Sequence, residues 1–418
     1  MIRSKQLLGV FLFTLLPGLV IAQNNTNSPY TRYGYGQLSD QTSSKSRGMG
    51  GVGYGIRDNF QINLSNPASY TAVDSLTFLF EGGITLQNTN FSDGTTKLNA
   101  KNSSFDYAVM QFRLHKRVAM SLGVLPYSNV GYNFGEYQED IENPNATAWV
   151  NYLGEGGLHQ GFIGLGFNVF KNFSIGANVS YFWGDIDRTR SVLINDSYAN
   201  SIEELTNLSV KDFKFDIGAQ YTHVLDKKNL FTVGAVFSPK RNLSNDSYIR
   251  TQTGNTQGGY VSHTKDTVAT FGIPMTIGAG LSYTYDQRLT VGLDFTMQKW
   301  ASVEYMDNPD YFTDRMIMAL GVEYLPSYTG HNYLSHIKYR LGGYYSQPYY
   351  KVSGSKAKEY GISGGIALPL PRTRSSLNIS AQYVRVDGQG VNMLKENYLK
   401  INIGLTFNER WFFKRKVD

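Results

Sequence analysis

The chain has 418 residues and a formal net charge of +6, with only 17% charged residues but 43 Gly, 30 Tyr and 24 Phe. Soluble domains rarely combine so many aromatic side chains with so few charges, and no basic helix or clustered basic face points to nucleic acid as a partner. The sequence contains no Cys, which excludes disulfides, thiolate metal sites and a lipid-modified N-terminus.

Residues 1–22 have the pattern of a secretory signal peptide. Arg3 and Lys5 precede an apolar run over residues 7–22, which ends on the small residue Ala22. A membrane anchor is the alternative, but the apolar run is short, so we expect cleavage after Ala22 and a mature chain that begins at Gln23. No later stretch approaches the roughly 18 to 20 apolar residues of a membrane helix, so a membrane-embedded mature chain would have to be a β-barrel.

Residues 23–74 are expected to form an N-terminal hatch. From residue 28 onward they show no period-two run, yet they are too apolar and aromatic for a disordered tail. Gly48, Gly50 and Gly53 match G-x-G-x-x-G, but a dinucleotide site also needs a preceding strand, a following helix and a later acidic residue. Because that context is missing, we interpret the glycines as a closely packed loop of the hatch and expect no cofactor.

Residues 75–413 are predicted to form a transmembrane antiparallel β-barrel, which places the chain in the all-β class. In residues 398–408, YLKINIGLTFN, apolar residues alternate with polar or small ones, as they do in a strand with two unlike faces. Similar segments recur along the chain, and we count about fourteen, an even number as in bacterial barrels. The clearest others are residues 173–183, 213–221, 273–283, 288–298 and 377–383.

The connections between these segments alternate between short and long. Tight turns are expected at residues 115–117, 171–172, 226–229 and 286–287, and long loops at 128–156, 185–211 and 239–267. Outer-membrane barrels have this asymmetry, with short turns in the periplasm, so both termini are expected there. A soluble β-sandwich also alternates, but it would not explain the loop asymmetry or the aromatic girdle predicted at Tyr181, Trp183, Tyr283, Tyr324, Tyr345 and Trp411.

The apolar face of each strand is therefore expected to contact lipid, and the polar face to line the lumen. This second face carries glycines and some charges, among them Lys338, Arg340, Lys400, Asp294 and Glu323. Glycine destabilises strands, so either the wall bends there or something packs closely against its inside. The glycines concerned are Gly176, Gly218, Gly278, Gly280, Gly292, Gly321, Gly342 and Gly404.

The export signal, the Gly-rich N-terminal segment, Asn66-Pro67-Ala68 within LSNPASY and the fourteen or so strands together resemble the FadL/TodX family of outer-membrane transporters. The resemblance implies a hatch inside the barrel and a hydrophobic ligand that leaves sideways through a gap at a kink in the third strand. Here the third strand is expected over residues 118–131, and Pro126 interrupts it and removes a ladder donor. Alternatively, Pro126 is merely tolerated at a strand end.

Two functions remain open at this stage. The first is a passive channel for fatty-acid-like hydrophobic small molecules, and the second is a non-transporting accessory barrel of an outer-membrane secretion or barrel-assembly complex. A continuous apolar pocket in the lumen would favour transport, and a filled lumen would favour the accessory role. An enzyme is not expected, because the six His residues are scattered without a nucleophile or acid partner. The basic tail, residues 414–418, is expected to be a solvated end in the periplasm.

Overall fold

The structure is a computed structural model that describes residues 25–139, 147–194, 199–267, 270–306, 308, 311–352, 356–388 and 394–410. The expected signal peptide, the basic tail and Trp411 lie outside these residues. Among the described residues, no helix has the length and apolar character needed to cross a membrane.

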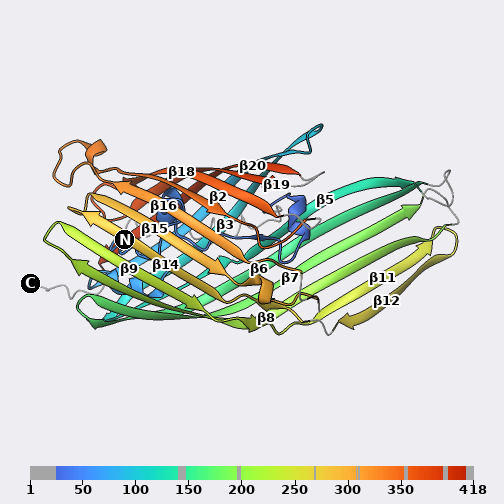
Figure 1. Ribbon diagram of the computed structural model, residues 1–418, viewed down its shortest axis with the longest axis horizontal. Coiled ribbons are helices and arrows are strands. Elements are labelled where there is room, and N and C mark those ends of the chain that lie inside the picture. Colours follow the sequence, from blue (N-terminus) through green and yellow to red (C-terminus); the bar gives the residue numbers. More distant parts are fainter. Residues whose placement is uncertain are drawn as a thin grey trace, which may run out of the picture.

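Most of the described strands belong to one antiparallel sheet that closes into a barrel (Figure 1). Fourteen strands make up the wall, which confirms the number expected from the sequence. The wall closes because the first and last strands pair along their length, from Thr77 opposite Arg410 to Ser92 opposite Lys395. The wall strands are β2 Thr77–Ser92, β3 Lys97–His115, β4 Val118–Pro126 with β5 Ser128–Glu139, β6 Thr147–Phe170, β7 Phe173–Ile194, β8 Ser201–Val224, β9 Asn229–Ser238, β14 Thr276–Tyr285, β15 Leu289–Gln298, β16 Arg315–Tyr324, β17 Lys338–Ser346, β18 Ala357–Pro369, β19 Ser376–Gly388 and β20 Lys395–Arg410.

The wall is apolar outside and polar inside, as the alternation predicts. In β15, Leu293 is 51% exposed, whereas the side chain next to it, Asp294, is only 5% exposed. In β20, Leu399 and Ile401 are likewise exposed and Asn402 is buried. Exposed apolar side chains on every second residue are the outward face that a lipid bilayer requires.

The expected third strand, residues 118–131, is wrong as a single strand. β4 and β5 follow one another along the same neighbour, β6, with Tyr127 between them. The backbone N–H of Tyr127 donates to the carbonyl of Leu158 at 2.7 Å, so the ladder to β6 continues across the break. The interruption at Pro126 is therefore real, but the strand resumes beyond it.

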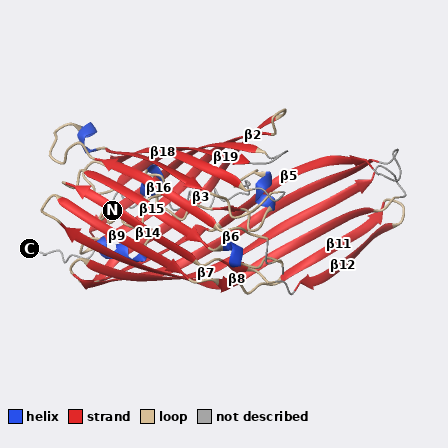
Figure 2. Ribbon diagram, in the orientation of Figure 1, coloured by secondary structure: helices blue, strands red, loops and turns tan. Residues whose placement is uncertain are grey.

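The long loops expected at residues 128–156, 185–211 and 239–267 are also wrong, because strands occupy most of them. β5, β6, β7 and β8 continue beyond the barrel and are joined by β11 (Ser247–Asn255) and β12 (Gly259–Thr267). Figures 1 and 2 show this extended sheet at the right, opposite the end that carries the short turns. Both of its faces carry polar residues, so the alternation that marks a membrane strand is missing there.

Residues 25–76, called the N-terminal segment below, precede the first wall strand. Its elements are η2 (Pro29–Arg32), β1 (Gln37–Leu38), α2 (Ser44–Gly48) and η3 (Pro67–Ala72). The remaining short elements of the chain are β10 (Arg241–Asn242), β13 (Gly272–Ile273), η4 (Trp300–Ser302) and η5 (Tyr333–His336).

The inward-facing glycines contact this segment. A methyl group on Gly176 would lie 2.4 Å from the carbonyl carbon of Pro67, and one on Gly342 would lie 2.2 Å from that of Met49. Distances this short leave no room for any side chain. The wall glycines are expected from the sequence either to bend the wall or to admit a closely packed segment, and close packing from inside holds at all eight positions. The other six are Gly218, Gly278, Gly280, Gly292, Gly321 and Gly404.

Candidate functional site

The candidate site is the lumen, and its mouth beside the extended sheet is filled by an aromatic cluster centred on Tyr35. The Tyr35 ring lies 5.3 Å from that of Tyr305 and 6.0 Å from that of Trp300. Its hydroxyl donates to the carbonyl of Gly272 at 2.9 Å, and its N–H donates to the hydroxyl of Tyr349 at 3.0 Å. The partners come from connections at the end where the extended sheet begins, so one residue of the N-terminal segment links several of them.

Deeper in the lumen, α2 is attached to the wall by a buried ion network. The ammonium of Lys45 lies 2.5 Å from the carboxylate of Asp58 and 3.0 Å from that of Glu323 on β16. Arg340 on β17 lies 2.7 Å from Glu323, and Lys338 lies 3.8 Å from Asp58. Lys45, Asp58, Glu323, Lys338 and Arg340 are called the ion network below.

The ion network fixes the N-terminal segment in one place. Burial alone would raise the pKa of Asp58, but the ammonium groups of Lys45 and Lys338 outweigh it and hold that pKa below its ordinary value. Arg340 also donates to Asn378 at 2.7 Å and to Gln61 at 3.0 Å. A buried charge that loses its partner costs several kcal/mol of free energy, so removal of the N-terminal segment from the lumen would be strongly unfavourable.

A second buried ion pair joins α2 to β3. Arg47 lies 2.7 Å from the carboxylate of Asp106 and donates to the hydroxyl of Thr85 at 2.9 Å. Asp106 is the extra residue where the register between β2 and β3 shifts, since Gly83 faces Tyr107 and the next residue, Ile84, faces Phe105. Nothing in the sequence singles out Asp106, because the alternation of apolar and polar residues does not give the register between β2 and β3.

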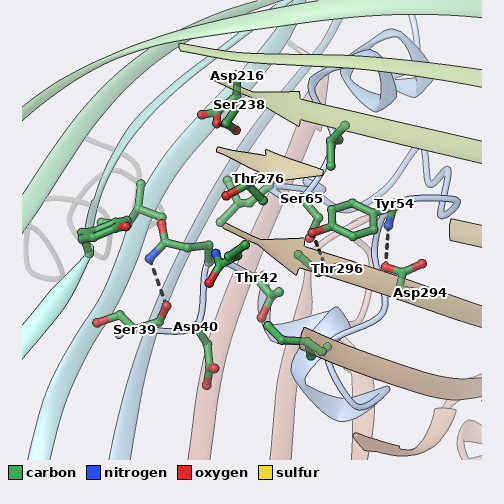
Figure 3. A pocket seen from close by; sticks show the side chains of 18 of the residues that line it. Ser39, Asp40, Thr42, Tyr54, Ser65, Asp216, Ser238, Thr276, Asp294 and Thr296 are labelled. Atoms are coloured by element: carbon green, nitrogen blue, oxygen red, sulfur yellow. Dashed lines mark hydrogen bonds between the residues drawn. The ribbon is translucent and has the colours of Figure 1, made fainter. Parts of the chain in front are cut away.

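A cavity of about 250 Å³ lies in the lumen between the N-terminal segment and the wall (Figure 3). Its lining includes ionisable side chains from the N-terminal segment and from β8, β15, β16 and β18. These are Asp40, Lys214, Asp216, Asp294, Arg315 and Glu359. The lining also includes apolar side chains such as Leu125, Phe162 and Ile317, so the charged groups interrupt an otherwise partly apolar surface. Pockets for hydrophobic ligands usually have few charged groups in their lining.

The three glycines of the predicted motif contact different parts of the wall. A methyl group on Gly48 would lie 3.2 Å from the Arg340 side chain. Gly50 has φ +70°, a conformation that favours glycine, and its N–H donates to Ser363 at 2.9 Å. The N–H of Gly53 donates to one oxygen of Asp294 at 2.7 Å, and the N–H of Tyr54 donates to the same oxygen at 2.8 Å. Figure 3 shows Tyr54 beside Asp294.

Asn66, Pro67 and Ala68 form the start of η3. The Asn66 side chain accepts a hydrogen bond from the N–H of Ala68 at 3.0 Å, and Pro67 occupies the first turn, where its missing donor is harmless. The Asn66 amide also donates to the carbonyl of Ala219 on β8 at 3.2 Å. The motif is therefore a helix cap that also attaches the segment to the wall.

Pro126 lies at a seam in the wall. β3 pairs with β4 only as far as Ala108 opposite Val124; beyond it, β5 pairs with β1 of the N-terminal segment. The side chain of Gln41 donates to the carbonyl of Pro126 at 2.9 Å. In an antiparallel strand, the backbone N–H and C=O of one residue point to the same neighbour. Because the carbonyl of Pro126 faces Gln41, a backbone N–H at this position would also face the N-terminal segment rather than β6.

The inward charges predicted from the sequence are confirmed, since Asp294, Glu323 and Arg340 are buried and contact the N-terminal segment. Gln41 and Arg47, which the sequence analysis did not single out, contact the seam and the bulge. Among the described residues, no group of three or more His, Asp or Glu side chains could hold a metal ion.

Comparison with known proteins places the chain in one family and relates its fold to several solved structures. A family model described as BamG matches residues 1–418. No curated protein matches the chain.

Several of the solved structures that match are channels or transporters of hydrophobic compounds. The toluene transporter TodX from P. putida is 14% identical, with 90% of this chain and 100% of that chain covered and a TM-score of 0.60. The toluene transporter TbuX from Ralstonia pickettii is also 14% identical, with 88% and 98% covered and a TM-score of 0.59. The monoaromatic hydrocarbon channel CymD is 14% identical, with 91% and 100% covered and a TM-score of 0.58.

At this identity the matches show the fold alone. The resemblance to the FadL/TodX family is thus confirmed for the barrel architecture, whereas the family model that matches the chain is a different one.

The ion network generates a first prediction. Arg340→Met leaves the Glu323 carboxylate with one close partner fewer, so we expect the free energy of unfolding in urea to fall by about 3 kcal/mol. Arg385→Met on β19, two strands away from β17, removes one side of a solvent-exposed pair with Asp387 and should cost less than about 0.5 kcal/mol. Equal losses for the two variants would show that the network does not stabilise the barrel.

Proposed function

The chain belongs to the BamG family, whose model matches it from end to end, and we propose that it is a non-transporting accessory β-barrel of an outer-membrane secretion or barrel-assembly complex. The observation that carries the proposal is the occupied lumen. Aromatic side chains fill one mouth, the ion network holds α2 to the wall, and six charged side chains lie among the apolar ones that line the remaining cavity. A route for a hydrophobic ligand would need a continuous apolar path, which these charged side chains interrupt.

In this proposal the N-terminal segment is a hatch that keeps the lumen closed, and the short turns and both termini lie in the periplasm. The extended sheet then stands outside the membrane on one side of the barrel. It offers partners two solvated faces and the free edge of β12, along which the described side chains are exposed. Charged residues such as Lys265 and Asp266 on that edge oppose unspecific strand pairing.

The proposal predicts that the protein is isolated with partners. Affinity-tagged full-length chain, extracted from outer membranes in mild detergent, should retain at least one other outer-membrane protein at near-equal amounts by quantitative mass spectrometry. A tagged barrel of similar abundance and unrelated function serves as the control. Recovery of the chain alone, together with loss of uptake of a hydrophobic compound in depleted cells, would reject the accessory role.

A second candidate function is passive uptake of hydrophobic compounds, and the seam favours it. Beyond Val124, the edges of β3 and β5 do not pair with each other, and β1 of the N-terminal segment lies against β5 instead. Val124 is exposed on the outer face, so an opening at this level would lead into lipid. The matching channels share this barrel architecture, although at an identity that shows only the fold.

If the seam is an exit, Pro126→Val should lower uptake. The backbone N–H of the new valine faces the N-terminal segment at the seam. A hydrogen bond formed there would raise the stability of the barrel by about 1 kcal/mol. Uptake of a radiolabelled hydrophobic compound is measured at matched surface expression, and Pro369→Val at the end of β18 is the control. Undiminished uptake in the Pro126→Val barrel rejects the lateral route.

A further inference from the structure

Three neighbouring turns at the short-turn end carry five exposed basic residues. Lys116 and Arg117 lie between β3 and β4, Lys171 lies between β6 and β7, and Lys227 and Lys228 lie between β8 and β9. We propose that these five residues, called the basic arc below, bind the headgroups of anionic phospholipids. The proposal does not depend on whether the barrel transports or assists assembly.

The three turns form one continuous surface. The N–H of Asn168 donates to the carbonyl of Arg117 at 2.8 Å, which joins the first turn to the second. The N–H of Thr222 donates to the carbonyl of Asn172 at 2.9 Å, which joins the second to the third. The five charges are therefore held on adjacent strands and act together on one membrane region.

The charges of the basic arc are not neutralised within the described part of the chain. None of the five residues lies within 4.0 Å of a described carboxylate in an ion pair. By contrast, Arg374 on the turn between β18 and β19 is paired with Asp74 at 3.2 Å. The five charges of the basic arc are thus available to a ligand.

The acidic residue within the arc, Asp226, is occupied by its own turn. Its carboxylate accepts hydrogen bonds from the N–H of Lys228 at 2.7 Å and from the N–H and side chain of Asn229 at 2.8 and 2.7 Å. The hydrogen bond from Lys228, followed by those from Asn229, lowers the pKa of Asp226. This carboxylate therefore caps the turn, and four net positive charges remain.

The depth of the basic arc relative to the membrane favours lipid headgroups over a protein as its ligand. Each turn is preceded by a strongly exposed apolar side chain, namely Leu114 at 55%, Phe170 at 70% and Leu225 at 60%. Exposed apolar and aromatic side chains at strand ends lie at the boundary of the acyl chains, so the basic residues that follow reach the phosphate level. Basic clusters at this depth attract anionic lipids, and lysine and arginine both bind phosphate.

The test compares two lipids on the full mature chain by native mass spectrometry. Phosphatidylglycerol and phosphatidylcholine with identical acyl chains are titrated onto the detergent-solubilised barrel. We expect at least about fivefold more phosphatidylglycerol than phosphatidylcholine adducts, because several basic residues act together. The preference should shrink in 0.5 M compared with 0.05 M salt, about 4 and 14 Å of screening length respectively.

Replacement of the basic arc should abolish the preference. The arc variant carries Lys116→Gln, Arg117→Gln, Lys171→Gln, Lys227→Gln and Lys228→Gln, and its heat-modified gel shift checks that the barrel is folded. The double variant Lys116→Gln/Lys171→Gln should lose part of the preference and serves if the larger variant does not fold. The control removes five exposed lysines at the opposite end of the barrel, Lys97, Lys101, Lys265, Lys351 and Lys395, each replaced by Gln.

Two outcomes of the lipid titration would overturn the proposal. One is a wild-type barrel that binds the two lipids equally, and the other is a preference that falls as far in the control as in the arc variant. Loss of a co-purifying acidic protein from the arc variant, with an unchanged lipid preference, would assign the arc to protein binding and likewise overturn the lipid assignment.

Discussion

A closed wall of fourteen strands encloses a lumen that wall side chains alone do not fill. The N-terminal segment meets this constraint, and much of the interior follows from it. Glycines appear on the wall where the backbone of the segment passes, as at Gly176 beside Pro67 and Gly342 beside Met49. Charged side chains lie on the inner face of the wall where α2 contacts it, as in the ion network. The inside of the wall and the first fifty or so described residues have complementary shapes.

The interruption between β4 and β5 goes with a second constraint. Some strands continue beyond the barrel into the extended sheet, whereas others end at the rim of the barrel. β4 ends at Pro126, β3 bulges at Asp106, and β6 has positive φ angles at Gly156 and Gly157. A methyl group on Gly157 would lie 2.3 Å from the carbonyl of Ser128, so the strands approach too closely for another residue. Beyond the break, β5 to β8 continue with β11 and β12 as the extended sheet.

The sequence is informative wherever a strand has one apolar and one polar face. Leu399 to Asn408 alternate because lipid lies outside and the packed lumen inside, so strand type, number and facing could all be predicted. The extended sheet carries polar residues on both faces, and β12 therefore looks like a loop in the sequence. The break after Pro126 and the partner of Arg47 depend on pairing between residues far apart in the chain. The LSNPASY motif caps η3, a role that does not distinguish a channel from an accessory barrel.

The central claim is that the N-terminal segment closes the barrel. Single-channel conductance of the mature chain, compared with a variant lacking residues 28–74, tests it most directly, because the wall strands pair with one another without that segment. The full chain should be silent in a planar bilayer, and the shortened barrel should conduct in large, stable steps. Equal conductance of the two, whether open or silent, would contradict the account.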